Sequence, residues 1–176
     1  MPSKLAFVVL AATLGRAWSG EPAAEEYRVK GAFLLNFTRF VEWPAEAFKG
    51  PGDAIAICIL GASPFTADLD LAARGIRLGS RTVTVRQIPD AQQARACQMV
   101  FVSASERKRV HALLEALQGA SVLTVGESEG FLAAGGIVEF RLEENKVRMD
   151  ISEAAAKRAG LRISSKLLSL AQPAKR

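Results

Sequence analysis

Strand-length apolar runs alternate with helical stretches through the middle of the chain, and this alternation constrains the fold most. Residues 54–61, 98–103 and 121–125 are apolar runs of buried-strand length, and residues 81–88 resemble a strand nearer a sheet edge. Helical spacing of apolar residues separates them, as in residues 106–119. The pattern predicts a single-domain α/β sandwich with a mainly parallel sheet flanked by helices, and the right-handed crossover rule favours a flavodoxin-like or Rossmann-like winding.

A helix is predicted for the segment that precedes the first strand. Val29, Phe33, Phe37 and Phe40 recur at helical spacing, and Pro44 is expected to end the helix because the residue before a proline avoids the α region. The aromatic stripe predicts core packing. The alternative is a groove for an apolar ligand or partner.

A C-terminal antiparallel hairpin is predicted over residues 136–152, followed by helices near 153–160 and 165–171. Apolar residues alternate with polar ones along both arms, so one face of the hairpin should pack on the core. The carboxylates are expected on the solvent side or in the turn: Glu139, Glu143, Glu144 and Asp150.

Two registers of this hairpin are possible. A turn at Asn145 and the next residue sets Arg141 opposite Asp150 and Glu143 opposite Arg148, which is favourable by a few tenths of a kcal/mol per pair. A turn one residue earlier opposes like charges, but it places Asn145 where a positive φ is needed. We favour the first register.

The first 19 residues have the pattern of a secretory signal peptide. Lys4 precedes an apolar run over residues 5–15, which is about half the ~20 residues that span a bilayer. An A-x-S cleavage context follows at residues 17–19. We expect a soluble, exported protein whose domain covers residues 25–171. Removing Lys4 and Arg16 with this segment lowers the formal charge from +5 to +3, so nucleic-acid binding has little support.

Cys58 and Cys97 are the only cysteines. In an exported protein an even count suggests one disulfide, whereas two buried thiols are the alternative. The two residues do not form a C-x-x-C motif, which disfavours a thioredoxin-like redox enzyme.

The glycine-rich stretch LTVGESEGFLAAGGIVEF, residues 123–140, does not predict a phosphate site. It lacks the lysine of a Walker loop, and Glu127 and Glu129 would repel a phosphate. Ser128 fits the centre of a G-x-S-x-G elbow, but no histidine follows His111 to act as its base. We expect Gly126 to turn the chain out of a strand, and Ser128 or Glu127 to cap a short helix that contains Phe131.

His111 is the only histidine and is expected on an exposed helix face. Without a second histidine or a Cys/His cluster, the sequence predicts neither a zinc site nor a catalytic constellation. No cofactor is expected.

Five stretches together resemble the YfiR/HmsC-like family of bacterial periplasmic proteins over roughly residues 25–171. They are EYRVKGAFLLNFTRFVEWP, ICILGASPF, CQMVFVSASE, LTVGESEGFLAAGGIVEF and AAAKRAGLRISSKLLSLA. The resemblance implies a periplasmic, non-enzymatic repressor. Such a protein binds the sensory domain of an inner-membrane diguanylate cyclase and so restrains cyclic-di-GMP signalling and biofilm formation.

The resemblance also implies binding partners and a disulfide. A homodimer is expected, and an OmpA-like outer-membrane lipoprotein can sequester such proteins. Cys58 and Cys97 match one cysteine pair of the family, while a second pair that some members carry is missing. Ser152 stands where an asparagine is expected, and either residue can cap the helix that follows.

The sequence suggests two candidate surfaces for partner binding. The first is the outward side of the hairpin, and the second is the basic pair of last helices. The residues are Glu139, Arg141, Arg148, Asp150, Lys157, Arg158 and Arg162. The alternative function is a periplasmic ligand-binding sensor module for a histidine kinase or transporter.

Overall fold

The computed structural model describes residues 21–171. The predicted signal peptide, residues 1–19, lies outside the described residues. Within the described part of the chain, no helix combines the length and apolar character needed to cross a membrane.

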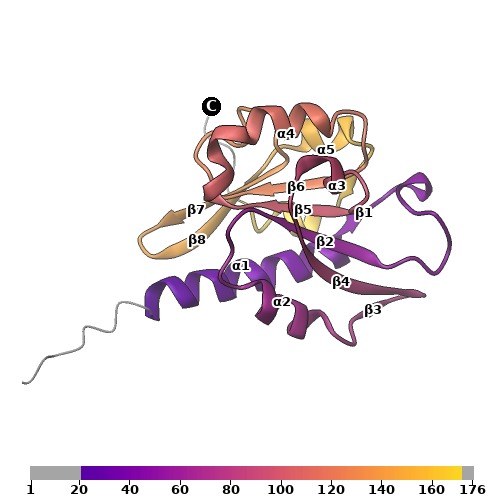
Figure 1. Ribbon diagram of the computed structural model, residues 1–176, viewed down its shortest axis with the longest axis horizontal. Helices are drawn as coiled ribbons and strands as arrows, with labels where there is room; N and C mark the ends of the chain where they lie inside the picture. The colour runs from indigo at the N-terminus through magenta and orange to yellow at the C-terminus, as the bar shows by residue number, and fades with distance from the viewer. Residues whose placement is uncertain (1–20, 172–176) are drawn as a thin grey trace, which may run out of the picture.

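A seven-stranded sheet forms the centre of the molecule, in the order β3-β4-β2-β5-β6-β7-β8 (Figure 1). Its five inner strands are parallel, and the two edge strands run antiparallel to their neighbours. Taken in chain order, the parallel strands have the flavodoxin-like 2-1-3-4-5 arrangement, so the predicted fold class is confirmed. The strands are β2 (Ile55–Leu60), β3 (Arg77–Leu78), β4 (Arg81–Ile88), β5 (Met99–Val102), β6 (Leu123–Gly126), β7 (Val138–Glu143) and β8 (Lys146–Ile151).

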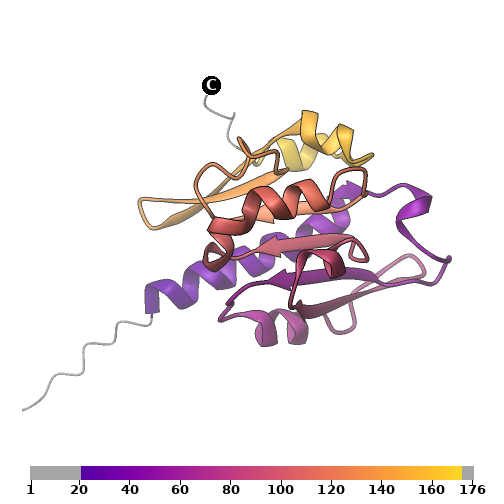
Figure 2. The same ribbon diagram turned by 45° about the horizontal axis from the view of Figure 1, so that its top comes forward.

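Helices cover both faces of this sheet (Figures 1 and 2). One face packs on α1 and α2, and the other face packs on α3 and α4. The helices are α1 (Glu21–Phe40), α2 (Thr66–Ala73), α3 (Ala91–Ala94), α4 (Val110–Ala116), α5 (Glu153–Arg158) and α6 (Ser165–Leu168), with 3-10 helices η1 (Ala45–Ala47) and η2 (Ala104–Arg109).

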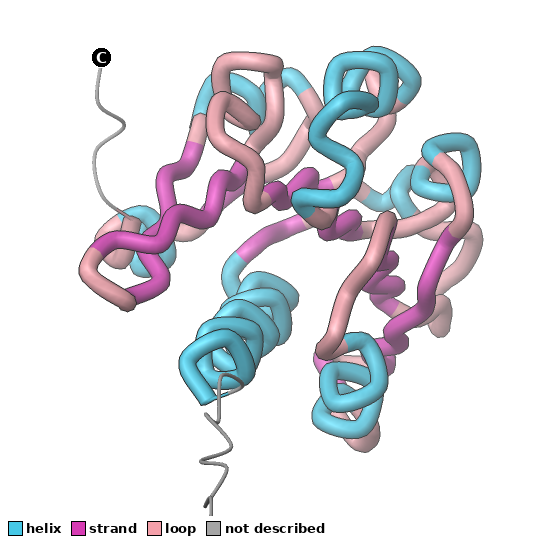
Figure 3. Tube along the Cα trace, turned by 60° about the vertical axis from the view of Figure 1, so that its left-hand side comes forward, coloured by secondary structure: helices cyan, strands magenta, loops and turns pink. Residues whose placement is uncertain are grey.

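The long helix α1 lies inside the curl of the sheet (Figure 3). Its fully buried side chains are Leu34 and Phe37, and Phe37 stacks on Phe140 of β7 with ring centroids 6.1 Å apart. The predicted core stripe is therefore confirmed at Phe37, whereas Phe33 and Phe40 are only half-buried.

The end of α1 differs from the prediction. The helix stops at Phe40, four residues before Pro44, because Val41 starts the short strand β1 (Val41–Glu42). This strand pairs antiparallel with β9 (Arg162–Ile163), and Ser164 N–H donates to the Phe40 carbonyl at 2.9 Å. The end of α1 is thus set by pairing between two segments far apart in the sequence, which the spacing of apolar residues within the helix cannot show.

The opposite face holds a smaller core. Val110, Leu113, Leu114 and Leu117 are buried there, which confirms the predicted apolar face of this helix. Ser103 caps η2, since its hydroxyl accepts the Ser105 N–H at 3.3 Å.

The hairpin is confirmed, but the favoured register was wrong. Arg141 lies opposite Arg148, and Glu143 lies opposite Lys146. The turn is formed by Glu144 (φ 50°) and Asn145 (φ 59°), which is the backbone that a two-residue type I′ turn requires. The match of this turn to the twist of the strands outweighs cross-strand charge pairs of a few tenths of a kcal/mol.

Candidate functional site

An ion-pair cluster joins α1 to the carboxyl end of β6. Lys30 Nζ lies 2.6 Å from Glu127 Oε2, and the two side chains are only 5% and 4% exposed. Lys30 also pairs with Glu26, one helical turn earlier. Glu127 directly follows β6, so this contact fixes the first half of α1 against the carboxyl ends of the parallel strands.

Further hydrogen bonds satisfy the Glu127 carboxylate. Its Oε1 accepts the Ala104 N–H at 2.9 Å and the Tyr27 hydroxyl at 3.4 Å. Lys30 Nζ also lies 4.7 Å from the centre of the Tyr27 ring. Buried charges are stable only when they are paired and hydrogen-bonded in this way. Glu127 therefore holds the N-terminal helix in place.

The pKa values of this cluster follow from its burial and charges. Burial opposes the charged form of Lys30, but hydrogen bonds to Glu127 and Glu26 and the attraction of both carboxylates raise its pKa above the ordinary value. Burial, together with the charge of Glu127, raises the pKa of Tyr27. Lys30 is therefore a cation and Tyr27 a neutral phenol at neutral pH.

The glycine-rich stretch encloses one aromatic ring. Phe131 is 1% exposed, and a Cβ added at Gly126 or Gly136 would overlap its ring. Glu139 accepts the Leu132 N–H at 3.0 Å and so ties the same loop to β7. The expected short helix was wrong, because residues 129–135 form consecutive turns. The glycines leave room for Phe131.

Ser128 and His111 lie in surroundings unlike those of a catalytic pair. Ser128 is 5% exposed, whereas the serine of a nucleophile elbow is displayed to the substrate. His111 is exposed on α4, as predicted. Among residues 21–171, no group of three or more His, Cys, Asp or Glu side chains could hold a metal ion.

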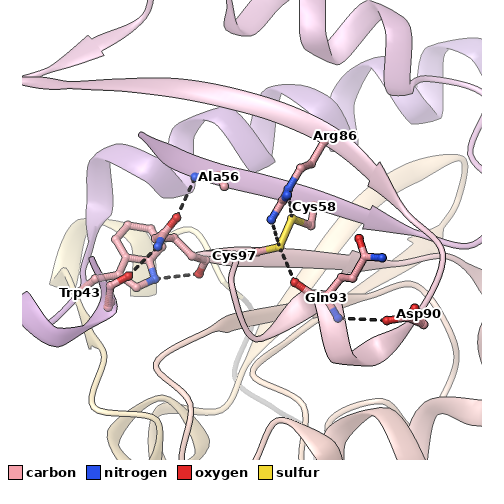
Figure 4. The surroundings of a disulfide bond; sticks show 9 residues. Trp43, Ala56, Cys58, Arg86, Asp90, Gln93 and Cys97 are labelled. Atoms are coloured by element: carbon pink, nitrogen blue, oxygen red, sulfur yellow. Dashed lines mark hydrogen bonds between the residues drawn. A yellow bond between two sulfur atoms is a disulfide. The ribbon is translucent and has the colours of Figure 1, made fainter. Parts of the chain in front are cut away.

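Cys58 and Cys97 form a disulfide, which confirms the predicted bridge (Figure 4). It links the middle of β2 to the loop before β5, and both residues are at most 2% exposed. The exposed Arg86 of β4 lies over it and donates to Cys58 Sγ at 3.3 Å and to Cys97 Sγ at 3.5 Å. The bridge thus belongs to the core on the α4 face.

The hairpin residues proposed for partner binding are placed differently from each other. Glu139 and Asp150 are 6% and 7% exposed, so their predicted position on the solvent side was wrong. Asp150 pairs with Arg141 at 2.6 Å diagonally across the strands, and Glu139 holds the Phe131 loop. Arg148 is exposed, and Arg141 is partly exposed and also pairs with Glu143. Of these four proposed residues, only the two arginines are accessible to a partner.

The three basic residues proposed near the C-terminus, Lys157, Arg158 and Arg162, are exposed. Lys157 and Arg158 are in the last turn of α5, as predicted. Arg162 was expected in a helix, but it lies in β9 because that segment pairs with β1. Its guanidinium is 3.5 Å from Glu42. Ser152 caps α5 through the Ala155 N–H, as the sequence suggested.

Two cavities of comparable size lie on opposite faces of the sheet. One, of about 750 Å³, lies between α4 and α5, and its lining includes His111 and Arg158. The other, of about 690 Å³, lies between α1 and α2, and its lining is largely apolar, with Tyr27 and Phe65 stacked at 5.3 Å. Sequence patterns did not predict the first cavity. The apolar groove given as the alternative for α1 was expected at the aromatic stripe, whose residues do not line the second cavity.

The Lys30 cluster was also not predicted, although one signal for it is visible in the sequence. Lys30 occupies the helix position one turn before Leu34, on the buried side of α1. Glu26 precedes it at the i,i+4 spacing that favours an ion pair. A charged lysine on the buried side of a helix needs a buried carboxylate as its partner, and Glu127 is that partner.

Comparison with the solved structures gives matches of low sequence identity. A conserved domain protein from Vibrio cholerae O1 biovar eltor strain N16961 superposes with a TM-score of 0.57 at 12% identity, and the match covers 85% of this chain and 60% of that one. The chain thus spans less than two thirds of that protein, and the likeness shows the fold. The ABC domain from Streptococcus pneumonia, solved in complex with L-Trp, gives a TM-score of 0.48 at 11% identity over 67% of this chain and 54% of its own.

Comparison with curated protein sequences gives no match. The YfiR/HmsC-like family model, in contrast, matches residues 27–172. That range contains the residues that the structure brings together, from Tyr27 and Lys30 on α1 to Glu127 after β6 and the Phe131 loop. Because the match extends over most of the sequence and over all of these contacts, the chain belongs to the YfiR/HmsC-like family.

Proposed function

We propose that this protein is a periplasmic repressor that binds the sensory domain of an inner-membrane diguanylate cyclase and lowers cyclic-di-GMP production. The family match over residues 27–172 carries the proposal, because the family is known for periplasmic repressors of diguanylate cyclases. The disulfide supports the compartment, since such bonds persist outside the reducing cytoplasm.

The proposed mechanism is differential binding without chemistry. A regulator shifts the equilibrium of its partner only if it binds the inactive state more tightly than the active state. Exposed cations are available for such contacts at Arg148, Lys157, Arg158 and Arg162. The buried Glu139 and Asp150 would act behind this surface, by fixing the hairpin and the loop next to it.

Two further partners belong to the proposal. A homodimer is expected, and light scattering on the purified exported protein should give twice the mass of one chain. An OmpA-like outer-membrane lipoprotein would release the cyclase by sequestering the repressor. Co-purification of the lipoprotein from envelopes at the expense of the cyclase would support this exchange.

Deletion of the gene tests the main proposal. Cyclic-di-GMP and surface attachment should rise in the deletion strain and return to normal when the exported wild-type protein is supplied. Deleting the partner cyclase in the same strain should abolish the rise. Unchanged cyclic-di-GMP in a strain whose parent is shown to express the protein would refute the proposal.

The apolar cavity between α1 and α2 favours one second candidate, a ligand-binding sensor for a histidine kinase or transporter. Cavities of this size with mostly apolar walls are typical small-molecule sites. In that case deletion would leave cyclic-di-GMP unchanged and alter the output of a kinase or transporter encoded nearby. Narrowing the cavity with Ala32→Trp would then abolish the response to the ligand.

A further inference from the structure

One crossover of the sheet lacks a helix. The connections from β2 to β4, from β4 to β5 and from β5 to β6 each contain a helix, namely α2, α3 and α4. Residues 127–137 connect β6 to β7 through turns alone. Phe131 of this connection packs in the core of the α4 face. The face of the sheet over β6 and β7 therefore lacks the helix that covers such strands in a doubly wound fold.

The cavity of about 750 Å³ lies where that helix would be. Its floor consists of buried apolar side chains from α4, from the residues directly before β6 and β7 and from α5, including Leu114, Val122, Ile137 and Ala155. The polar side chain Thr124 is 4% exposed and accepts the Ile137 N–H at 3.0 Å. Because the floor is apolar apart from this hydroxyl, it favours an apolar occupant.

The walls of the groove carry opposite charges. Glu115 is exposed on the α4 wall, and Arg158 is exposed on the α5 wall, with Lys157 next to it. Neither Glu115 nor Arg158 forms an ion pair with another residue of the described chain. An occupant that fits the groove would therefore present a cation toward α4 and an anion toward α5.

We propose that this groove binds an amphipathic α-helix of the regulated partner in place of the missing crossover helix. The helix would place apolar residues at i, i+3, i+4 and i+7 on the floor, a basic flank against Glu115 and an acidic flank against Arg158. The inference rests on the proposed function, because the helix is assigned to the periplasmic domain of the diguanylate cyclase.

Photo-crosslinking in cells tests the location of the site. A photoreactive residue in place of Gln118, which is exposed and lines the groove, should crosslink to a helical peptide with an apolar stripe and charged flanks. The matched control is the same residue in place of Ala72, which is exposed in the cavity between α1 and α2. The control position should not capture that peptide.

Variants of the purified full chain test which side chains of the groove contribute to binding. The measured quantity is their affinity for the periplasmic domain of the cyclase. Ala159→Arg fills the groove and should weaken binding at least roughly tenfold, as loss of a buried contact at an interface centre does. Arg158→Glu, at an exposed position that leaves the core untouched, should weaken it by about tenfold because it opposes the acidic flank. Ala72→Arg should bind like the wild type.

The outcomes separate the two proposals. If the wild type binds the cyclase domain and neither groove variant weakens it, the groove inference is wrong and the proposed function stands. If the cyclase domain does not bind but Gln118 captures such a helix from another envelope protein, the groove stands and the proposed function is wrong. Crosslinks to a second copy of this chain, or no crosslinks from Gln118, would overturn the groove.

Discussion

The two faces of the sheet are stabilised by different means. On the α1 face, Phe37, Phe101 and Phe140 form a continuous aromatic core, and the Lys30–Glu127 pair closes one end of it. On the α4 face the core is smaller, a disulfide crosses it, and a groove stays open between α4 and α5 at the start of β6 and β7. The α1 face combines an aromatic core with the apolar cavity between α1 and α2, whereas the α4 face combines a covalent link with an uncovered surface.

This difference suggests a division of roles. The aromatic core between α1 and the sheet has no room for a partner without repacking, so the room on this face is confined to the cavity between α1 and α2. The α4 face has fewer buried side chains and gains rigidity from the disulfide, while the apolar floor of its groove stays accessible. The comparison can be tested by weakening each face in turn.

Removing the disulfide should have the largest effect. The double variant Cys58→Ala/Cys97→Ala should lose about 4 kcal/mol of unfolding free energy, because the bridge closes a loop between residues 39 positions apart. Urea unfolding followed by far-UV circular dichroism measures the change. Reduction should destabilise the wild type to the same level and leave the variant unaffected. Equal stability of the oxidised wild type and the variant would show that packing alone holds the α4 face.

Lys30→Met should cost about 3 kcal/mol on the α1 face, because it leaves the buried Glu127 without a counter-charge. The value is at the low end for a broken buried pair, since Ala104 and Tyr27 still donate to the carboxylate. The double variant Lys30→Met/Glu127→Met removes both charges and should recover much of the loss. If the single variant loses less than about 1 kcal/mol of unfolding free energy, the Lys30–Glu127 pair contributes no more than a solvent-exposed salt bridge.

Alkaline pH should weaken the α1 face through the same cluster. The folded pKa values of Lys30 and Tyr27 are both raised, so the folded state holds these protons more tightly than the unfolded state. Their contribution is complete below the unfolded values near 10 and is lost as pH rises through the folded values. Unfolding midpoints between about pH 9 and pH 11.5 should fall more steeply for the wild type than for Lys30→Met.

Gly126→Ala should cost about 2 kcal/mol, because the added Cβ would overlap the Phe131 ring and displace it from the α4-face core. The matched control is Gly52→Ala, since a Cβ there meets nothing within 4 Å. Thermal unfolding of both variants gives the comparison. A Gly126→Ala protein as stable as the control would show that the loop around Phe131 adapts freely.

The sequence predicted the features that depend on local periodicity. The strands around Cys58 and Val100 were correct because burial on both faces makes each a continuous apolar run. The apolar face of α4 and the C-terminal hairpin were correct because burial on one side imposes a period of about 3.6 or of two residues. Features that depend on distant contacts were not predicted. The end of α1 at Phe40 is set by pairing with β9.

The candidate site shows the same division. The disulfide was predictable because the chain offers only one pair of cysteines. The burial of Glu139 was not predictable, because strand alternation places this residue on the outer side of the hairpin. It is buried only because the Phe131 loop folds over that side. The groove could not be predicted, since it results from the absence of a helix between β6 and β7.

The smallest effect is expected for the hairpin, and it tests the register directly. In the observed register Asp150 is diagonal to Arg141, at 2.6 Å, and Arg141 is opposite Arg148. Asp150→Asn should therefore cost about 1 kcal/mol, because the pair is only partly shielded from solvent.

Arg148→Ala separates the two registers. In the observed register it removes a like charge opposite Arg141, so stability should stay the same or rise by a few tenths of a kcal/mol. In the alternative register it would remove the partner of Glu143 and lower stability by a similar amount. Chemical unfolding of Arg148→Ala and Asp150→Asn, alone and combined, gives the sign, and a loss on Arg148→Ala would contradict the turn at Glu144 and Asn145.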